Sequence, residues 1–124
     1  MTIERDLMAA PKTATAPAAV SKSVAIGFAI SSPYLHVYPW SSSTGFGAKI
    51  SDPASNPSSQ CYSVAFTSNG DAIAVSSQNT PYVLAYPWSS SGFGTKFSNP
   101  STLPNGSGNG IAFTKSRSAI AVGH

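Results

Sequence analysis

The chain has 124 residues, of which 41% are hydrophobic and only 9% are charged, and its formal net charge is +3. The hydrophobic content is too high for a disordered chain, and the length fits one folded domain. The few cations are scattered along the sequence, which argues against a surface that follows a nucleic-acid backbone. We therefore expect no nucleic-acid partner. We also expect no membrane partner, because no stretch approaches the roughly 18 apolar residues of a membrane span.

Residues 1–22 stand outside the pattern of the rest and are rich in alanine, proline and threonine. Acidic residues occupy the place where a secretory leader needs a basic start and an apolar run, so we do not expect a cleaved leader. Pro11 and Pro17 would stop any helix after its first turns. We interpret this segment as an N-terminal arm. It either stays disordered or lies extended on a neighbouring subunit, where it would contact a protein partner.

From Ser23 onward, short apolar runs alternate with turn-forming residues, which is typical of an all-β protein. The pattern predicts nine strands, at about residues 24–30, 34–40, 46–51, 62–66, 72–76, 82–88, 93–98, 110–114 and 119–122. The strand at 82–88 is apolar on both faces of its pleat, and the strand at 34–40 departs from this only at His36. We therefore expect both strands to be covered on both sides by other layers.

Two turns in this pattern are predicted to differ. Asn69 and Gly70 lie between two predicted strands, and this pair favours a type I′ hairpin turn, in which both central residues have positive φ. The corresponding residues further along the chain are Ser116 and Arg117, which do not favour that turn. We therefore expect the second hairpin to use another turn type.

The two turns belong to a repeat, which is the strongest signal in the sequence. The segment that begins at Ser32 returns from Thr80, with an offset of 48 residues up to the Trp40/Trp88 pair and of 47 residues after the extra residue Thr44. A period of this length built from short strands is typical of β-propeller blades. We expect two such repeats in residues 23–124.

The order of strands from Val64 to Ser89 resembles the blade of a WD40-like β-propeller. Trp40 and Trp88 stand where the family has the tryptophan of its Trp-Asp pair, but serine follows each of them, so the hydrogen-bond network of the family cannot be carried over. The resemblance covers residues 24–122. It implies degenerate WD40-like propeller blades, of a kind similar to those in virus and phage structural proteins.

In blade order the chain supplies strands two, three and four, then a complete blade, then strands one and two. Two repeats cannot close a ring, because propellers have about four to eight blades. The chain must therefore assemble with copies of itself or belong to something longer. The predicted strands at 24–30 and 119–122 claim the same position in a blade, as a strand-sharing junction between subunits would require. We expect a homo-oligomer, with about three copies completing six blades.

No set of residues predicts catalysis, a cofactor site or a metal site. Asp71 lies in a predicted hairpin turn, and Leu84 replaces His36 in the second repeat, so neither residue fits a shared catalytic role. The single cysteine, Cys61, excludes a disulfide framework, and we interpret it as a buried or unreactive thiol. The protein is therefore not expected to be an enzyme.

Aromatic side chains recur at alternate positions of the repeated strand. Tyr38 and Trp40, with their equivalents Tyr86 and Trp88, are predicted to belong to the structural core, although such a ladder could also stack on sugars or bases. Phe46 and Phe93 follow in a glycine-flanked hairpin loop, where we expect exposed docking contacts.

These observations lead to two functional hypotheses. The favoured one is a non-enzymatic structural and interaction protein whose propeller blades self-assemble on the surface of a virion, with residues 1–22 as a tether. The alternative is a carbohydrate- or protein-binding propeller fragment of a longer chain. The virion is the favoured location and the cytoplasm the other.

Overall fold

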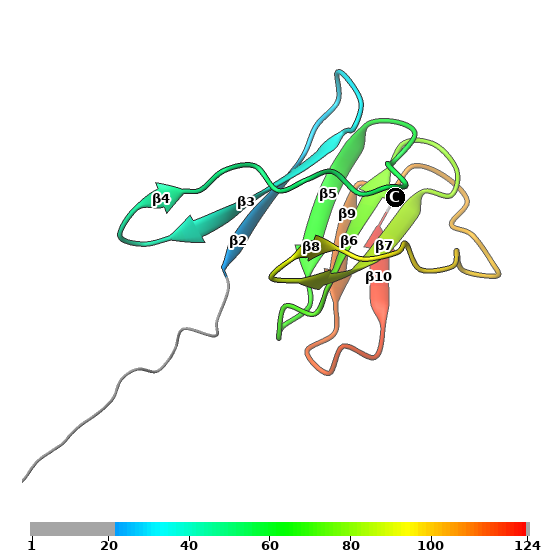
Figure 1. Ribbon diagram of the computed structural model, residues 1–124. Helices are drawn as coiled ribbons and strands as arrows, with labels where there is room; N and C mark the ends of the chain where they lie inside the picture. Colours follow the sequence, from blue (N-terminus) through cyan, green and yellow to red (C-terminus); the bar gives the residue numbers. More distant parts are fainter. Residues whose placement is uncertain (1–21, 124) are drawn as a thin grey trace, which may run out of the picture.

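A computed structural model describes residues 22–123, and these residues form an all-β structure without a helix (Figure 1). The predicted N-terminal arm, Lys22 apart, lies outside the described residues, as does His124. The described part has nine strands, so the expectation of an all-β fold is confirmed. They are β2 (Ser23–Gly27), β3 (Leu35–Ser41), β4 (Gly45–Phe46), β5 (Cys61–Phe66), β6 (Ala72–Ser77), β7 (Val83–Ser89), β8 (Gly92–Phe93), β9 (Gly110–Phe113) and β10 (Ile120–Gly123).

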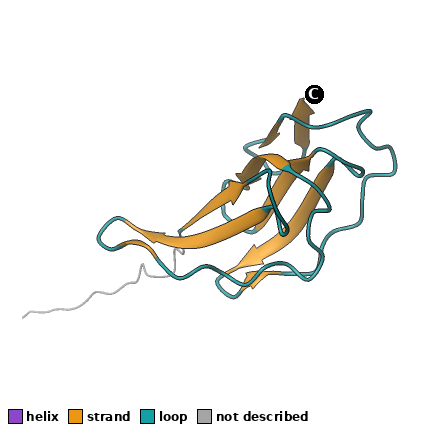
Figure 2. Cartoon of the chain, turned by 90° about the horizontal axis from the view of Figure 1, so that it is seen from above, coloured by secondary structure: helices purple, strands orange, loops and turns teal. Residues whose placement is uncertain are grey.

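The strands form three antiparallel sheets in chain order: a first sheet β2-β3-β4, a second sheet β5-β6-β7-β8 and a third sheet β9-β10. Seen from above in Figure 2, the sheets follow one another, with the β9-β10 hairpin beside the marked C terminus. Within residues 22–123 the three sheets do not close into a ring. Because every connection joins neighbouring strands, each sheet is built from consecutive hairpins.

The main core lies between the first and second sheets. Leu35 and Val37 of the first sheet meet the second sheet's Tyr86 and Trp88, together with the aliphatic side chains of β6. Tyr86 is fully buried, and its hydroxyl group donates a hydrogen bond of 2.6 Å to the backbone carbonyl oxygen of Ser55. A buried tyrosine hydroxyl requires such a partner. This contact ties the loop after the first sheet onto the second sheet.

The sequence repeat extends to the backbone. Val24 pairs with Tyr38 across the β2-β3 ladder as Ile73 pairs with Tyr86 across the β6-β7 ladder. After each hairpin, one amide returns to the same point of the preceding strand: Ile50 donates to the Val37 carbonyl at 2.8 Å and Phe97 to the Ala85 carbonyl at 2.9 Å. Structural equivalence can therefore be read residue by residue, and Tyr38 corresponds to Tyr86.

Two predicted strands are much shorter than expected. Strands were predicted at 46–51 and 93–98, whereas β4 and β8 end at Phe46 and Phe93. Gly47 and Gly94 follow them, and a Cβ atom on Gly94 would lie 2.9 Å from Cβ of Pro87. The chain passes closely over a proline at this point and then leaves the ladder, since a proline has no amide hydrogen with which to continue the pairing.

The expectation of two different hairpin turns is wrong. At the 67–70 turn the amide of Gly70 donates to the carbonyl oxygen of Thr67, and at the 114–117 turn the amide of Arg117 donates to that of Thr114, each at 2.9 Å. Gly70 has φ 75° and Arg117 has φ 63°. Only this one position needs a positive φ, as in a type I turn followed by a left-handed residue, so the second turn forms without an Asn-Gly pair.

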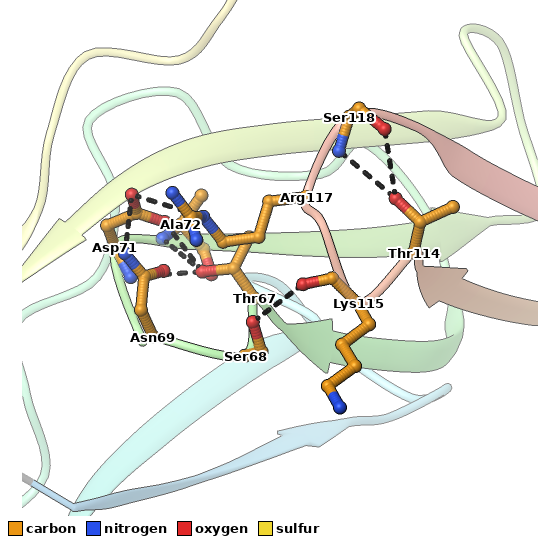
Figure 3. Close-up of polar contacts among 9 residues, drawn as sticks. All are labelled: Thr67, Ser68, Asn69, Asp71, Ala72, Thr114, Lys115, Arg117 and Ser118. Atoms are coloured by element: carbon orange, nitrogen blue, oxygen red, sulfur yellow. Dashed lines mark hydrogen bonds and ion pairs between the residues drawn. The ribbon is translucent and has the colours of Figure 1, made fainter.

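A threonine hydroxyl group stabilises both turns (Figure 3). Oγ1 of Thr67 accepts hydrogen bonds from the amides of Asp71 and Ala72, each at 3.0 Å. Oγ1 of Thr114 accepts from Ser118 at 3.0 Å and from Ala119 at 3.1 Å. Because the side chain satisfies two backbone donors, the turn tolerates a non-glycine residue in the left-handed conformation.

We expect Thr67→Val to lower the free energy of unfolding by about 1–3 kcal/mol, since two backbone donors lose their acceptor at a site that is 7% exposed. Thr114→Val is the matched control. It removes the same two hydrogen bonds in an exposed hairpin, where water can replace them, so a smaller loss is expected. Urea denaturation of the two variants measures the difference. Equal losses would show that burial of the threonine does not matter.

Candidate functional site

The six aromatic residues singled out from the sequence form two equivalent clusters. In the first sheet the ring centroid of Phe46 lies 5.9 Å from that of Tyr38 and 5.0 Å from that of Trp40, with the rings edge to face. In the second sheet the ring of Phe93 lies 5.3 Å from Tyr86 and 5.0 Å from Trp88, again edge to face. The hairpin phenylalanine therefore packs on its own sheet in both repeats.

The two clusters differ in exposure. Trp88 is 8% exposed and Tyr86 fully buried, whereas Trp40 is 39% exposed and Phe46 is 61% exposed. The expectation that Trp40 is buried like Trp88 is therefore wrong for the single chain. The physical reason is the neighbouring sheet, because the first sheet covers Trp88 and no sheet among residues 22–123 covers the same face of the first sheet.

That uncovered face of the first sheet is called here the outer face. It consists of Val24, Ile26, His36, Tyr38 and Trp40, which share one side of the β2-β3 pleat. Ile26 is 45% exposed and the others are half-buried or exposed. The equivalent side chains of the second sheet, Ile73, Val75, Leu84, Tyr86 and Trp88, are all buried in the main core. The outer face is thus built like a core surface and left uncovered.

A groove of about 390 Å³ lies on the opposite side of the second sheet, beside the edge of β10 that pairs with no other strand of residues 22–123. It is called here the end groove and is lined by Val83, Pro100, Thr102, Leu103, Pro104, Ile120 and Val122. The lining is mainly apolar, and Ile120 is 39% exposed there. Phe97, 50% exposed, continues the apolar surface along the same side. Large apolar side chains exposed together are typical of interaction surfaces.

A second groove, of about 410 Å³, lies where the 67–70 turn meets the start of β2. Trp40, Trp88 and Phe66 line it together with Asn69 and Ser68. Aromatic faces beside amide and hydroxyl groups suit a polar ligand with apolar faces, such as a sugar. Figure 3 shows that Ser68 also reaches the neighbouring hairpin, where its hydroxyl donates to the Lys115 carbonyl at 3.1 Å.

The titratable side chains of this region are held by burial, hydrogen bonds within turns and packing on aromatic rings. Burial raises the pKa of the Cys61 thiol to about 12. Hydrogen bonds from Thr67 and Asn69 lower the pKa of Asp71, which also lies 3.9 Å from the guanidinium group of Arg117. His36 packs edge to face on Phe28 at 4.7 Å. Among residues 22–123, no group of three or more histidine, cysteine or acidic side chains could hold a metal ion.

The end groove was not predicted from the sequence. Its residues lie mostly in the 100–104 loop, which the pattern of strands treats only as a connection. The signal was present in the repeat, because Thr102 and Pro104 correspond to Ser55 and Pro57 at the offset of 47 residues. Pro57 is fully buried beside the main core, so the equivalence marks the later loop as a surface prepared for burial.

No family model and no curated protein matches the chain. Residues 22–123 contain no helix that is long and apolar enough to cross a membrane.

Proposed function

We propose that this chain is a non-enzymatic structural and interaction protein that self-assembles through WD40-like propeller blades. One observation carries the proposal: side chains that are buried between sheets in the second sheet are uncovered at the equivalent positions of the first. When a second surface covers an apolar surface with the composition of a core, apolar area is removed from water and the free energy of the system falls. The self-assembly would occur on a virion, as the resemblance to virus and phage proteins implies.

Incomplete sheets support the same proposal. Among residues 22–123 the second sheet has four strands, whereas the first sheet shows no equivalent of β5 and the third sheet shows no equivalents of β7 and β8. Among the described residues β2 pairs only with β3 and β10 only with β9, so each has a free edge. Free edges are sites for pairing with another chain. In the proposed assembly, strands of neighbouring copies complete one another's blades.

The surroundings of the titratable groups support a role without catalysis. A thiol whose pKa is raised to about 12 stays protonated near neutral pH and is a poor nucleophile. The carboxylate oxygens of Asp71 are used within a turn, where they accept hydrogen bonds from the Thr67 hydroxyl group at 2.7 Å and from the Asn69 side-chain amide at 3.1 Å. Both groups are explained by the fold itself.

Sedimentation velocity over a dilution series tests the proposal. With increasing concentration, the full chain should convert from a 12.7 kDa monomer into one discrete larger species, with three copies as the expected number. A chain that stays monomeric at the highest concentration, or that forms only polydisperse aggregates, contradicts self-assembly and favours a propeller fragment.

A second candidate function, carbohydrate binding, is favoured by the groove between Trp40 and Trp88. A panel of immobilised neutral and acidic glycans tests it. Binding of one glycan class that is lost in Asn69→Ala but kept in Asn79→Ala, an asparagine outside the groove, supports the candidate. A panel without any binding contradicts it.

A further inference from the structure

A site equivalent to the end groove exists inside the chain, and there a tyrosine side chain occupies it. Tyr86 lies between the first and second sheets, in one cluster with Leu35, Ile73 and Val75, all fully buried. Its hydroxyl group donates to the carbonyl of Ser55, in the loop that follows the first sheet. The site around Tyr86 is therefore made by one strand of the first sheet, two positions of β6 and the 53–57 loop.

The lining of the end groove corresponds to this site residue by residue. Val83 corresponds to Leu35, Ile120 to Ile73 and Val122 to Val75, as the strand registers show. In the following loop, Thr102 and Pro104 correspond to Ser55 and Pro57 at the 47-residue offset. The end groove is thus a second copy of the site that holds Tyr86, but with an exposed Ile120 in place of a fully buried Ile73.

The residue that corresponds to Tyr86 in the other repeat is Tyr38. It lies on the outer face, half-buried, and among residues 22–123 its hydroxyl group has only a 3.4 Å contact with Nδ1 of His36. From these equivalences we infer that Tyr38 of a second copy of this chain inserts into the end groove and donates its hydroxyl hydrogen bond to the carbonyl of Thr102. The inference rests on the proposed self-assembly and specifies its interface.

The interface would continue the sheet-to-sheet packing already present in the chain. The β3 side chains of the outer face, His36, Tyr38 and Trp40, would cover Val83, Ala85 and Phe97 of the next copy. Within one chain the second sheet covers Leu35, Val37 and Ile50 in the same way. Two different surfaces meet, so the contact is head to tail, and such contacts form rings when the rotation between copies closes. It would cover apolar side chains that are exposed in the single chain, with Trp40, Phe46, Phe97 and Ile120 among them.

One strand must change partner for Tyr38 to enter. In the β6-β7 ladder Ile73 lies opposite Tyr86, so the incoming Tyr38 would lie opposite Ile120 on the free edge of β10. β2 of the incoming copy pairs with β3 at that same position and would have to leave it. The two strands are nearly interchangeable, since residues 24–27 read Val-Ala-Ile-Gly and residues 120–123 read Ile-Ala-Val-Gly. β10 of one copy can therefore replace β2 of the next.

Photo-crosslinking tests the contact. Benzoylphenylalanine replaces Tyr38 in the full chain, and the variant is mixed with isotope-labelled chain, irradiated and mapped by mass spectrometry. We expect links between chains that join position 38 to residues 100–104 or 120–122. The matched control carries the probe at Tyr62, which is 43% exposed on β5 and outside both surfaces, and should give no link to the end groove.

Association of Tyr38→Ala gives the second readout. We expect its self-association to weaken by about thirtyfold, the usual effect of losing a buried aromatic anchor, while Tyr62→Ala associates as the parent chain does. If the parent forms oligomers but the links from position 38 map elsewhere and Tyr38→Ala associates normally, the assigned contact is wrong and the proposed self-assembly stands. If the parent remains monomeric, both are wrong.

Discussion

Replacement of Trp88 by alanine should lower the free energy of unfolding by about 3–5 kcal/mol, the usual cost of removing a buried large aromatic side chain. Trp88 is 8% exposed and packs against Phe66 and Phe93, with ring centroids 5.6 Å and 5.0 Å away. Alanine would leave a cavity between the first and second sheets that the surrounding strands cannot fill. Urea denaturation at low protein concentration, where the proposed assembly is expected to dissociate, measures the loss.

Trp40→Ala is the matched control for this prediction. Trp40 has the same place in the repeat but is 39% exposed, and Phe46 is its only close aromatic partner among the described residues. We expect a loss of about 1 kcal/mol or less in the monomer, together with weaker self-association at higher concentration. An equal loss of unfolding free energy in the two monomeric variants would contradict the conclusion that Trp88 is covered by a neighbouring sheet and Trp40 is not.

Deletion of residues 119–124 should abolish self-association. The deletion removes β10 and with it Ile120 and Val122, which line the end groove and offer the free edge for pairing. The main core contains no residue of β10, so the first two sheets should keep their structure. Sedimentation velocity measures association, and the near-ultraviolet circular dichroism of the buried Trp88 and Tyr86 reports whether the core is intact.

Deletion of residues 1–15 is the control for this truncation. These residues lie outside both proposed surfaces in the sequence, so the shortened chain should associate like the parent and lose only the tether that we predict for the arm. An associated species that survived loss of residues 119–124 but not loss of residues 1–15 would contradict the strand-sharing account. It would place the contact in the arm instead.

The sequence predicted the all-β class, the nine strands of residues 22–123 and the equivalence of the two repeats, because these depend on local pattern and on spacing. The burial of individual side chains, in contrast, did not follow from the sequence pattern. The strand at 34–40 has nearly the same apolar pattern as the strand at 82–88, yet Trp40 and Trp88 differ in exposure. A sequence pattern shows which faces are suited to burial, whereas the presence of a neighbouring sheet decides which of them are covered.

The turns show a second limit of sequence reasoning. The Asn-Gly pair led to the prediction of a type I′ turn. In the structure the Thr67 hydroxyl group stabilises the turn by accepting a backbone hydrogen bond, and a threonine at the equivalent position 114 does the same. A comparison of the two copies, rather than of one dipeptide with turn preferences, would have revealed the shared side chain. The same comparison would have revealed the end groove through Thr102 and Pro104.

Amide hydrogen exchange compared between dilute and concentrated protein tests the central claim most directly, namely that neighbouring copies complete one another's sheets. On association, the amides of β10 and of residues 100–104 should become protected, while those of β6, already paired on both edges, should change little. Association that left β10 exchanging as fast as in the monomer would contradict the account.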